Sequence, residues 1–176
     1  MKNGLLTTLV GSTISSSTWK FFEGLCKGEI CNIEHIVNLK DIPHIVVANH
    51  VSHMDWLILH GLFGKKLGRQ ISFLAKKELF ESKFWKHVAL YGKAIKLDRD
   101  NVTKDVLKNI RSSIKKNYVI GIFPEGTRSM DGKLLKAKEG AVKLAYMTGL
   151  PIVPIGLNGF HNILPKKSII PVPHKC

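Results

Sequence analysis

The segment Ile45–Trp56 reads IVVANHVSHMDW and decides the fold. Its first four residues are apolar and typical of a buried strand, and a short polar turn with His50, His53 and Asp55 follows them. The spacing of apolar side chains beyond this turn is that of a helix. A strand that runs through a polar turn into a helix is the repeating unit of an α/β domain, and it places functional groups where the strand ends.

Two residues of this turn could form a catalytic pair. A histidine can take a proton from a hydroxyl near neutral pH, and a carboxylate on its other ring nitrogen fixes the tautomer. Residues five apart lie about 140° apart around a helix, so His50 must lie in the turn and Asp55 in the first helical turn if they are to meet. Ser52 predicts such a helix start, because it precedes Asp55 by three residues as in a capping box. The alternative is that Asp55 only caps the helix and that His50 and His53 are ordinary loop histidines.

Strands and helices alternate along the rest of the chain. We predict helices at 1–27, 55–63, 78–90, 102–116 and 138–148, and strands at 29–39, 44–48, 71–75, 94–97, 119–123 and 151–157. Because most of these strands are continuous apolar runs, they predict a single α/β domain with a largely parallel central sheet flanked by helices and an active site at the carboxyl ends of the strands.

Two parts of the chain allow more than one interpretation. Residues 1–28 carry aromatic side chains beside lysines, so this helical segment would suit a membrane interface or would pack on the domain at 29–176. The aromatic face of the helix at 78–90 would belong to the core or would wall a groove for an acyl chain. A basic turn is expected at 64–68, with Arg69 directly after it.

Composition narrows the choice of partner. Lys and Arg number 27 against 13 acidic residues, a net charge of +14, which predicts an anionic partner such as a nucleic acid, a membrane surface or a phosphorylated ligand. No motif of a nucleic-acid reader is present, so we expect no nucleic acid. The three cysteines lack metal-site spacing and favour a reducing environment, and His50-x-x-His53-x-Asp55 has no further His or Cys cluster to complete a metal site. No apolar run approaches the ~20 residues that span a bilayer.

Three predicted strand ends carry polar groups: His50 with Asp55, then Asp98-Arg99, then residues 125–128. The ends of parallel strands meet along one edge of the sheet, so these groups are expected to face one site. Arg99 and Arg128 offer planar forks suited to a phosphate. Gly126 lets the backbone approach a ligand closely. Each arginine taken alone would more often be a surface residue, and it is the convergence that favours a site.

These residues resemble the motifs of the glycerolipid acyltransferases, whose best-known members make phosphatidate from lysophosphatidate. The segment NHVSHMD at 49–55 is similar to the first motif, FPEGTRS at 123–129 to the third, KEG at 138–140 to the Lys-x-Gly that follows, and LPIVPI at 150–155 to the fourth. The second motif departs from the pattern, since Gly92 lies one residue early and Lys96 replaces an aromatic residue, although Asp98-Arg99 is present. The resemblance covers about residues 40–165. Relatives usually continue beyond the last motif, so the domain at 29–176 is expected to be C-terminally short or a minimal version.

The resemblance implies transfer of a fatty acyl group from acyl-CoA or acyl carrier protein to the hydroxyl of lysophosphatidate, with no cofactor or metal and no covalent enzyme intermediate. His50 would be the general base and Asp55 would orient it. Arg99 and Arg128 would hold the acceptor phosphate within the loop of Gly126 and Thr127, Glu125 would bind the glycerol part or brace the loop, and Lys76 would stabilise the oxyanion. The protein would be peripheral, on the anionic cytoplasmic face of a membrane.

Two other functions are compatible with the same residues. A hydrolase could use the His50–Asp55 pair on a lipid ester, and a non-catalytic basic module could bind anionic headgroups through its arginines.

Overall fold

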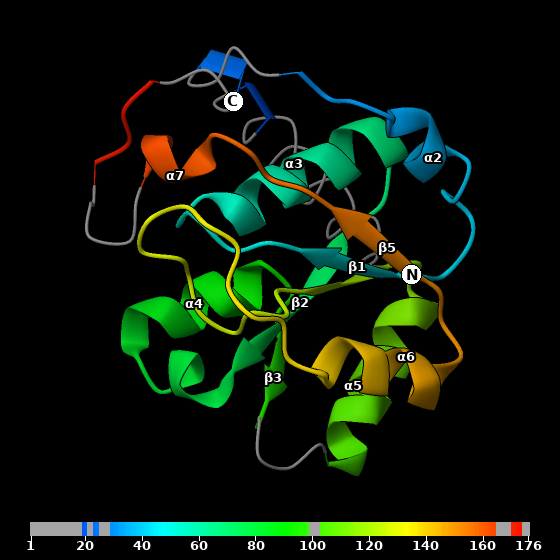
Figure 1. Ribbon diagram of the computed structural model, residues 1–176. Helices are drawn as coiled ribbons and strands as arrows, with labels where there is room; N and C mark the ends of the chain where they lie inside the picture. Colours follow the sequence, from blue (N-terminus) through cyan, green and yellow to red (C-terminus); the bar gives the residue numbers. More distant parts are fainter. Residues whose placement is uncertain (1–18, 21–22, 25–28, 99–102, 165–169, 174–176) are drawn as a thin grey trace, which may run out of the picture.

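The computed structural model describes residues 19–20, 23–24, 29–98, 103–164 and 170–173 of the chain. Its centre is a five-stranded sheet in the order β3-β2-β4-β1-β5, and every neighbouring pair is parallel. The strands are β1 (Ile45–Ala48), β2 (Ile71–Lys76), β3 (Ile95–Leu97), β4 (Val119–Ile122) and β5 (Ile152–Ile155). The helices are α2 (Ile33–Val37), α3 (Asp55–Leu67), the short 3₁₀ helix η1 (Lys77–Phe80), α4 (Lys83–Tyr91), α5 (Lys104–Lys115), α6 (Gly140–Thr148) and α7 (Phe160–Ile163). Figure 1 shows them around the sheet. The predicted α/β domain with a parallel sheet is confirmed.

Side chains point alternately to the two faces of the sheet along each strand, and this divides the core into two parts, one on each face. In β1, Val46 packs with the helix α3 and with α7, whereas its neighbour Ile45 packs with α5 and α6. Both side chains are fully buried. Successive side chains of a strand point to opposite faces, so apolar residues throughout a short strand serve two helical layers at once. Because all the strands are parallel, their carboxyl ends lie at one edge of the sheet, where the polar turns lie.

The segment 29–39 is not a strand, contrary to the prediction. Residues Ile33–Val37 form the helix α2, which follows Asn32 in the left-handed region at φ 56°. Ile33 and Ile36 pack against the core at helical i, i+3 spacing. The apolar residues here are thus spaced for one face of a helix, and the β-branched side chains misled the prediction.

The predicted basic turn at 64–68 is also wrong, because α3 continues to Leu67 and ends at Gly68, whose φ of 62° is left-handed. Lys65 and Lys66 therefore lie in the last helical turn. Arg69 is buried: its Nε donates to the carbonyl of Asn117 and its Nη1 to that of Ile42, at 3.1 and 3.0 Å. Burial lowers the pKa of Arg69. This arginine joins three loops at the edge of the sheet where the strands begin, opposite the polar turns.

The N-terminal segment is described only at residues 19–20 and 23–24. Trp19 is buried in the core beside Gly61 of α3, and its indole Nε1–H donates to Glu23 at 2.6 Å. At this residue the segment packs on the domain. The rest of the predicted interfacial stretch lies outside the described residues. In the part of the chain that the structure describes, no helix is long and apolar enough to cross a membrane.

Candidate active site

His50 and Asp55 meet at the end of β1 as a hydrogen-bonded pair. His50 lies in the turn and Asp55 begins α3, which is the arrangement that their spacing requires. Their Nδ1 and Oδ2 atoms are 2.8 Å apart, and the carboxylate is fully buried whereas the imidazole is about one-fifth exposed. With Nδ1 held by the carboxylate, Nε2 is the ring nitrogen that can accept a proton from a ligand.

The same carboxylate also organises the turn. The backbone N–H groups of Val51 and Ser52 donate to Asp55 Oδ2 at 2.7 and 2.8 Å. Asp55 therefore orients His50 and closes the turn, and the two interpretations of this residue are compatible. The complete capping box is absent, however. Met54, not Ser52, is the N-cap residue, and Ser52 Oγ donates to the carbonyl of Leu164 instead.

Glu125 joins the loop after β4 to the turn that holds His50. Its Oε1 accepts the backbone N–H of His50 at 2.9 Å and its Oε2 accepts that of Leu135 at 3.2 Å. The N–H of Ser129 donates in turn to the carbonyl of His50 at 2.8 Å. Glu125 is buried, and of the two roles open to it from the sequence, these contacts fit a brace of the loop.

The other residues expected at the site gather around one pocket, with one exception. Lys76, Gly126, Thr127 and Arg128 line it together with His50. Gly126 has a φ of 69°, a conformation that side chains disfavour, so the tight turn there requires glycine. Arg99 lies outside the described residues. Asp98 directly follows β3. Its Oδ2 forms an ion pair with Lys77 Nζ, and the two atoms are 2.7 Å apart.

Arg128 lies in the electrostatic field of the Asp55 carboxylate. It is partly buried, and burial lowers the pKa of its guanidinium, whereas the negative charge of Asp55 opposes that shift. An arginine remains charged under such a shift, because its ordinary pKa lies far above neutral pH. The site therefore offers a fixed positive charge near the His50–Asp55 pair, which would suit an anionic ligand.

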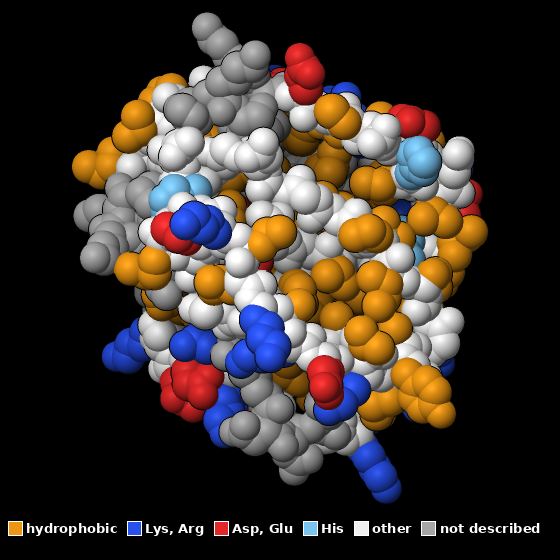
Figure 2. Space-filling view, viewed as in Figure 1, with side chains coloured by type: hydrophobic (Ala, Val, Ile, Leu, Met, Phe, Trp, Pro, Cys, Tyr) orange, Lys and Arg blue, Asp and Glu red, His pale blue; other side chains and the backbone are white. Residues whose placement is uncertain are grey.

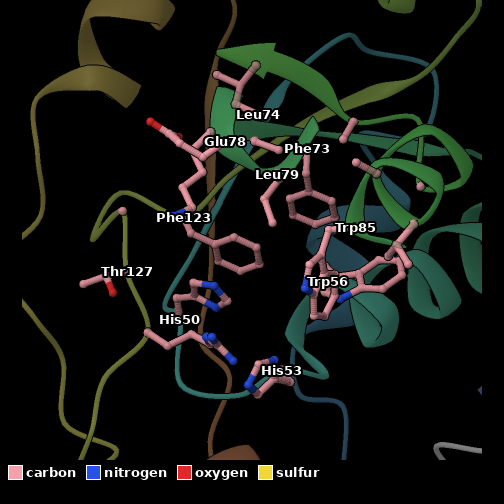
Figure 3. A pocket seen from close by; sticks show the side chains of 18 of the residues that line it. His50, His53, Trp56, Phe73, Leu74, Glu78, Leu79, Trp85, Phe123 and Thr127 are labelled. Atoms are coloured by element: carbon pink, nitrogen blue, oxygen red, sulfur yellow. The ribbon is translucent and has the colours of Figure 1, made fainter. Parts of the chain in front are cut away.

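The pocket has a volume of about 740 Å³, and most of the residues that line it beyond His50 are apolar. Figure 3 shows Phe123 lying between His50 and Phe73, with Trp56 and Trp85 on the opposite side. The lining residues are His50, His53, Trp56, His60, Phe73, Leu74, Ala75, Lys76, Glu78, Leu79, Trp85, Val88, Ala89, Gly92, Ala94, Phe123, Gly126, Thr127 and Arg128. The aromatic face of the predicted helix at 78–90 thus contributes Trp85 to this wall. Within the described ranges, no group of three or more His, Cys, Asp or Glu side chains could hold a metal ion.

Three residues of the site were given no role in the sequence analysis. Phe123 stacks on the His50 ring, Asn49 holds the backbone N–H and C=O of Leu157 at 2.6 and 2.8 Å, and His60 lies in the apolar wall. Asn49 and Phe123 begin the motif segments at 49–55 and 123–129, and that position was a signal for both. His60 had no signal, because a histidine on a helix is most often part of the core.

His60 makes the stability of the fold sensitive to acid. Burial lowers its pKa from 6.5 to about 4, although a hydrogen bond with the carbonyl of Gly92 opposes this. The unfolded chain therefore takes up a proton at His60 below pH 6.5 and the folded chain does not, so the free energy of unfolding falls as the pH falls from 6.5 to 4, by up to about 3 kcal/mol at about 1.4 kcal/mol per pH unit. Urea unfolding of His60→Gln is expected to show a shallower decline over this range. An equal decline in both proteins would contradict this account.

The sequence is similar to those of known acyltransferases. The Acyltransferase family model matches residues 29–158. A probable 1-acyl-sn-glycerol-3-phosphate acyltransferase of Mycoplasma pneumoniae is 36% identical over 130 residues, which are 70% of this chain and 48% of that protein. The chloroplastic 1-acyl-sn-glycerol-3-phosphate acyltransferase LPAT1 of Arabidopsis thaliana is 35% identical over 141 residues, 78% of this chain and 38% of that protein.

A solved structure agrees with these relatives. The crystal structure of the 1-acyl-sn-glycerophosphate (LPA) acyltransferase PlsC from Thermotoga maritima superposes with a TM-score of 0.73 at 29% identity, covering 94% of this chain and 65% of that chain. This chain spans about half or less of the length of the two curated relatives.

Proposed function

The chain belongs to the acyltransferase family, and from that premise we propose that it transfers a fatty acyl group from an acyl thioester to the hydroxyl of lysophosphatidate and so makes phosphatidate. The observation that carries the proposal is the His50–Asp55 pair, 2.8 Å apart, at the head of a pocket that also holds Arg128 and an apolar wall. One site thus combines a base for a hydroxyl, a cation for a phosphate and an apolar surface for an acyl chain.

The reaction follows from the positions of these groups. His50 Nε2 removes the proton of the acceptor hydroxyl while Asp55 stabilises the imidazolium. The oxygen attacks the thioester carbonyl, the C–S bond breaks, and the thiolate takes the proton back from His50. Lys76 is our candidate for the oxyanion, because it ends β2 and lines the pocket. Acyl-CoA and acyl carrier protein are both possible donors, and the reaction uses no other cofactor.

The test of this proposal is the reaction itself. The purified chain is supplied with lysophosphatidate and a long-chain acyl-CoA or acyl carrier protein, and phosphatidate is quantified. Phosphatidate from either donor supports the proposal, and the donor with the larger kcat/KM identifies the carrier. Glycerol 3-phosphate in place of lysophosphatidate tests the acceptor. If neither donor yields phosphatidate, the proposed function is wrong.

Arg128 is expected to bind the acceptor phosphate. A charge-assisted hydrogen bond contributes about 1.5–3 kcal/mol, so Arg128→Ala should raise the KM for lysophosphatidate roughly 10- to 150-fold and leave the KM for the thioester nearly unchanged. Arg128→Lys should recover only part of the loss, because an ammonium group cannot make the bidentate contact. Arg111→Ala, an exposed arginine of α5 outside the pocket, is the matched control. A selective rise in the KM for the thioester would assign Arg128 to the donor instead.

We also propose that the protein binds the cytoplasmic face of a membrane peripherally. The support is a surface formed by the loop 130–138 and the helix α6, where hydrophobic side chains lie among lysines. Leu134 and Tyr146 are 77% and 91% exposed, and Lys133, Lys136 and Lys138 flank the leucine. Figure 2 shows hydrophobic side chains gathered over α6 and β5 on this face. Lysines near an anionic surface contribute about 1 kcal/mol each, and salt screens this attraction.

Membrane binding should therefore depend on salt. The protein is expected to sediment with anionic vesicles at low ionic strength and to be released at high salt or in alkaline carbonate. Leu134→Asp should weaken sedimentation, whereas Leu90→Asp, at an exposed leucine of α4, should not. Release only by detergent would mean that a segment inserts deeply and would contradict electrostatic binding.

A further inference from the structure

The imidazole of His50 is the end of a stack of three rings. Its centroid lies 4.1 Å from that of Phe123, with 15° between the two planes. Phe123 in turn lies 5.1 Å from Phe73, and these two rings are parallel to within 2°. The stack leads from the catalytic base into the apolar region, and all three residues line the pocket (Figure 3).

Gly121, on the strand beside Phe73, leaves space in the sheet for this stack. Phe73 of β2 stands opposite Gly121 of β4 in the parallel register, and Phe123 follows two residues later on the same face. A Cβ atom at Gly121 would lie only 2.5 Å from the Phe73 ring, a distance that real Cβ contacts do not reach. Glycine in the middle of a buried strand weakens the strand, and here it leaves the space that the Phe73 ring occupies beside Phe123.

Asp55 alone does not fix the plane of the imidazole. One hydrogen bond to Nδ1 selects the tautomer and limits rotation about the Cβ–Cγ bond, but a hydrogen bond tolerates misalignment of tens of degrees. Small changes in χ1 and χ2 can therefore still tilt the ring and move Nε2 away from the substrate hydroxyl. A flat ring stacked at 4.1 Å restricts this tilt. An aromatic face also favours a neighbouring cation, which His50 becomes when it holds the proton.

We propose that Phe123 is a positioning residue for His50, and that an acyl chain lying against Phe73 and Phe123 presses the stack together and so aligns the base. The proposal rests on the proposed function, because it assigns the apolar part of the pocket to the acyl group. It has a consequence for specificity: donors with chains long enough to reach Phe73 raise kcat, and do not merely lower the KM.

Four variants test the positioning role. Phe123→Leu keeps the wall apolar but removes the ring, and it should lower kcat by up to about 10²-fold, the order expected for a misplaced catalytic group, with a smaller change in the KM for lysophosphatidate. Phe123→Tyr keeps a ring and should retain most of the rate. In Gly121→Ala the new Cβ would clash with the Phe73 ring and displace it from the stack, so this variant should also lower kcat. Gly156→Ala, where an added Cβ meets nothing within 4 Å, is the matched control.

A second readout does not depend on turnover. In NMR spectra of the full chain, the ring protons of His50, identified by their loss in His50→Ala, should be shifted upfield by the Phe123 ring. They should move downfield in Phe123→Leu and in Gly121→Ala and stay in place in Phe123→Tyr and Gly156→Ala. Thermal unfolding checks that each variant is folded.

The outcomes separate this inference from the function on which it rests. If the natural chain makes phosphatidate but folded Phe123→Leu keeps its kcat, or if kcat does not depend on chain length, the positioning role is wrong and the proposed function stands. If the natural chain makes no phosphatidate, the function fails, and the NMR shifts still decide whether Phe123 fixes the His50 ring.

Discussion

His50→Ala is expected to lower the rate of phosphatidate formation by about 10²- to 10⁴-fold, the usual contribution of a general base. The imidazole can take a proton from a hydroxyl while the buried Asp55 carboxylate, 2.8 Å away, stabilises the charge that results. The fold should survive, because the partly exposed side chain lies in a turn and the backbone contacts of His50 to Glu125 and Ser129 remain. Initial rates and a thermal melt of the same preparation measure both effects.

His53→Ala is the control for this variant. His53 also lines the pocket. Asp55 Oδ2 accepts its hydrogen bonds from His50 Nδ1 and from the backbone N–H groups of Val51 and Ser52. The His53 variant is expected to retain most of the activity. If His53→Ala is inactive and His50→Ala turns over normally, the assignment of the base to His50 is wrong.

Asp55→Asn is expected to have the second largest effect, also of the order of 10²- to 10⁴-fold in kcat. An amide can replace the carboxylate in shape but cannot stabilise the imidazolium. Its oxygen can still accept from Val51 and Ser52, so the turn is retained. Asp55 Oδ1 has no hydrogen-bond partner among the described residues, and an amide nitrogen there would be buried without an acceptor, at a cost of about 1–3 kcal/mol.

Comparison of rate and stability separates the two roles of Asp55. A large loss of kcat with a modest fall in the melting temperature would show that its charge serves catalysis. If the variant unfolds but is fully active wherever it remains folded, Asp55 is only the residue that closes the turn. Asp131→Asn, at an exposed carboxylate in the loop after β4, controls for the loss of one negative charge near the site.

The parallel sheet could be predicted because its central strands are buried on both faces. In β1, the apolar run Ile45–Ala48 is bounded by polar turns and packs against helices on both sides of the sheet. The site could be predicted in part for the same reason, since the strand ends must meet at one edge. His50, Asp55 and residues 126–128 are indeed brought together there.

The errors have a common physical cause. At 29–39 the apolar residues fit a strand locally, but tertiary packing of Ile33 and Ile36 against the core selects the helix α2. At 64–68 glycines and lysines fit a turn, but α3 continues to Leu67, and three carbonyl groups surround Arg69 just beyond it. Contacts between distant segments determine both, as they determine the ring stack on His50, and a single sequence shows no trace of them.

The fate of a labelled acyl group tests the central claim most directly. The chain is incubated with lysophosphatidate and a thioester labelled in its acyl group, and the label is followed into phosphatidate, free fatty acid and unreacted thioester, alongside His50→Ala. We predict that the label passes into phosphatidate and that His50→Ala leaves it in the thioester. Label released as free fatty acid would mean that the pair serves hydrolysis, and label left in the thioester by the unaltered chain would mean that the site only binds lipid; either result would contradict acyl transfer by His50.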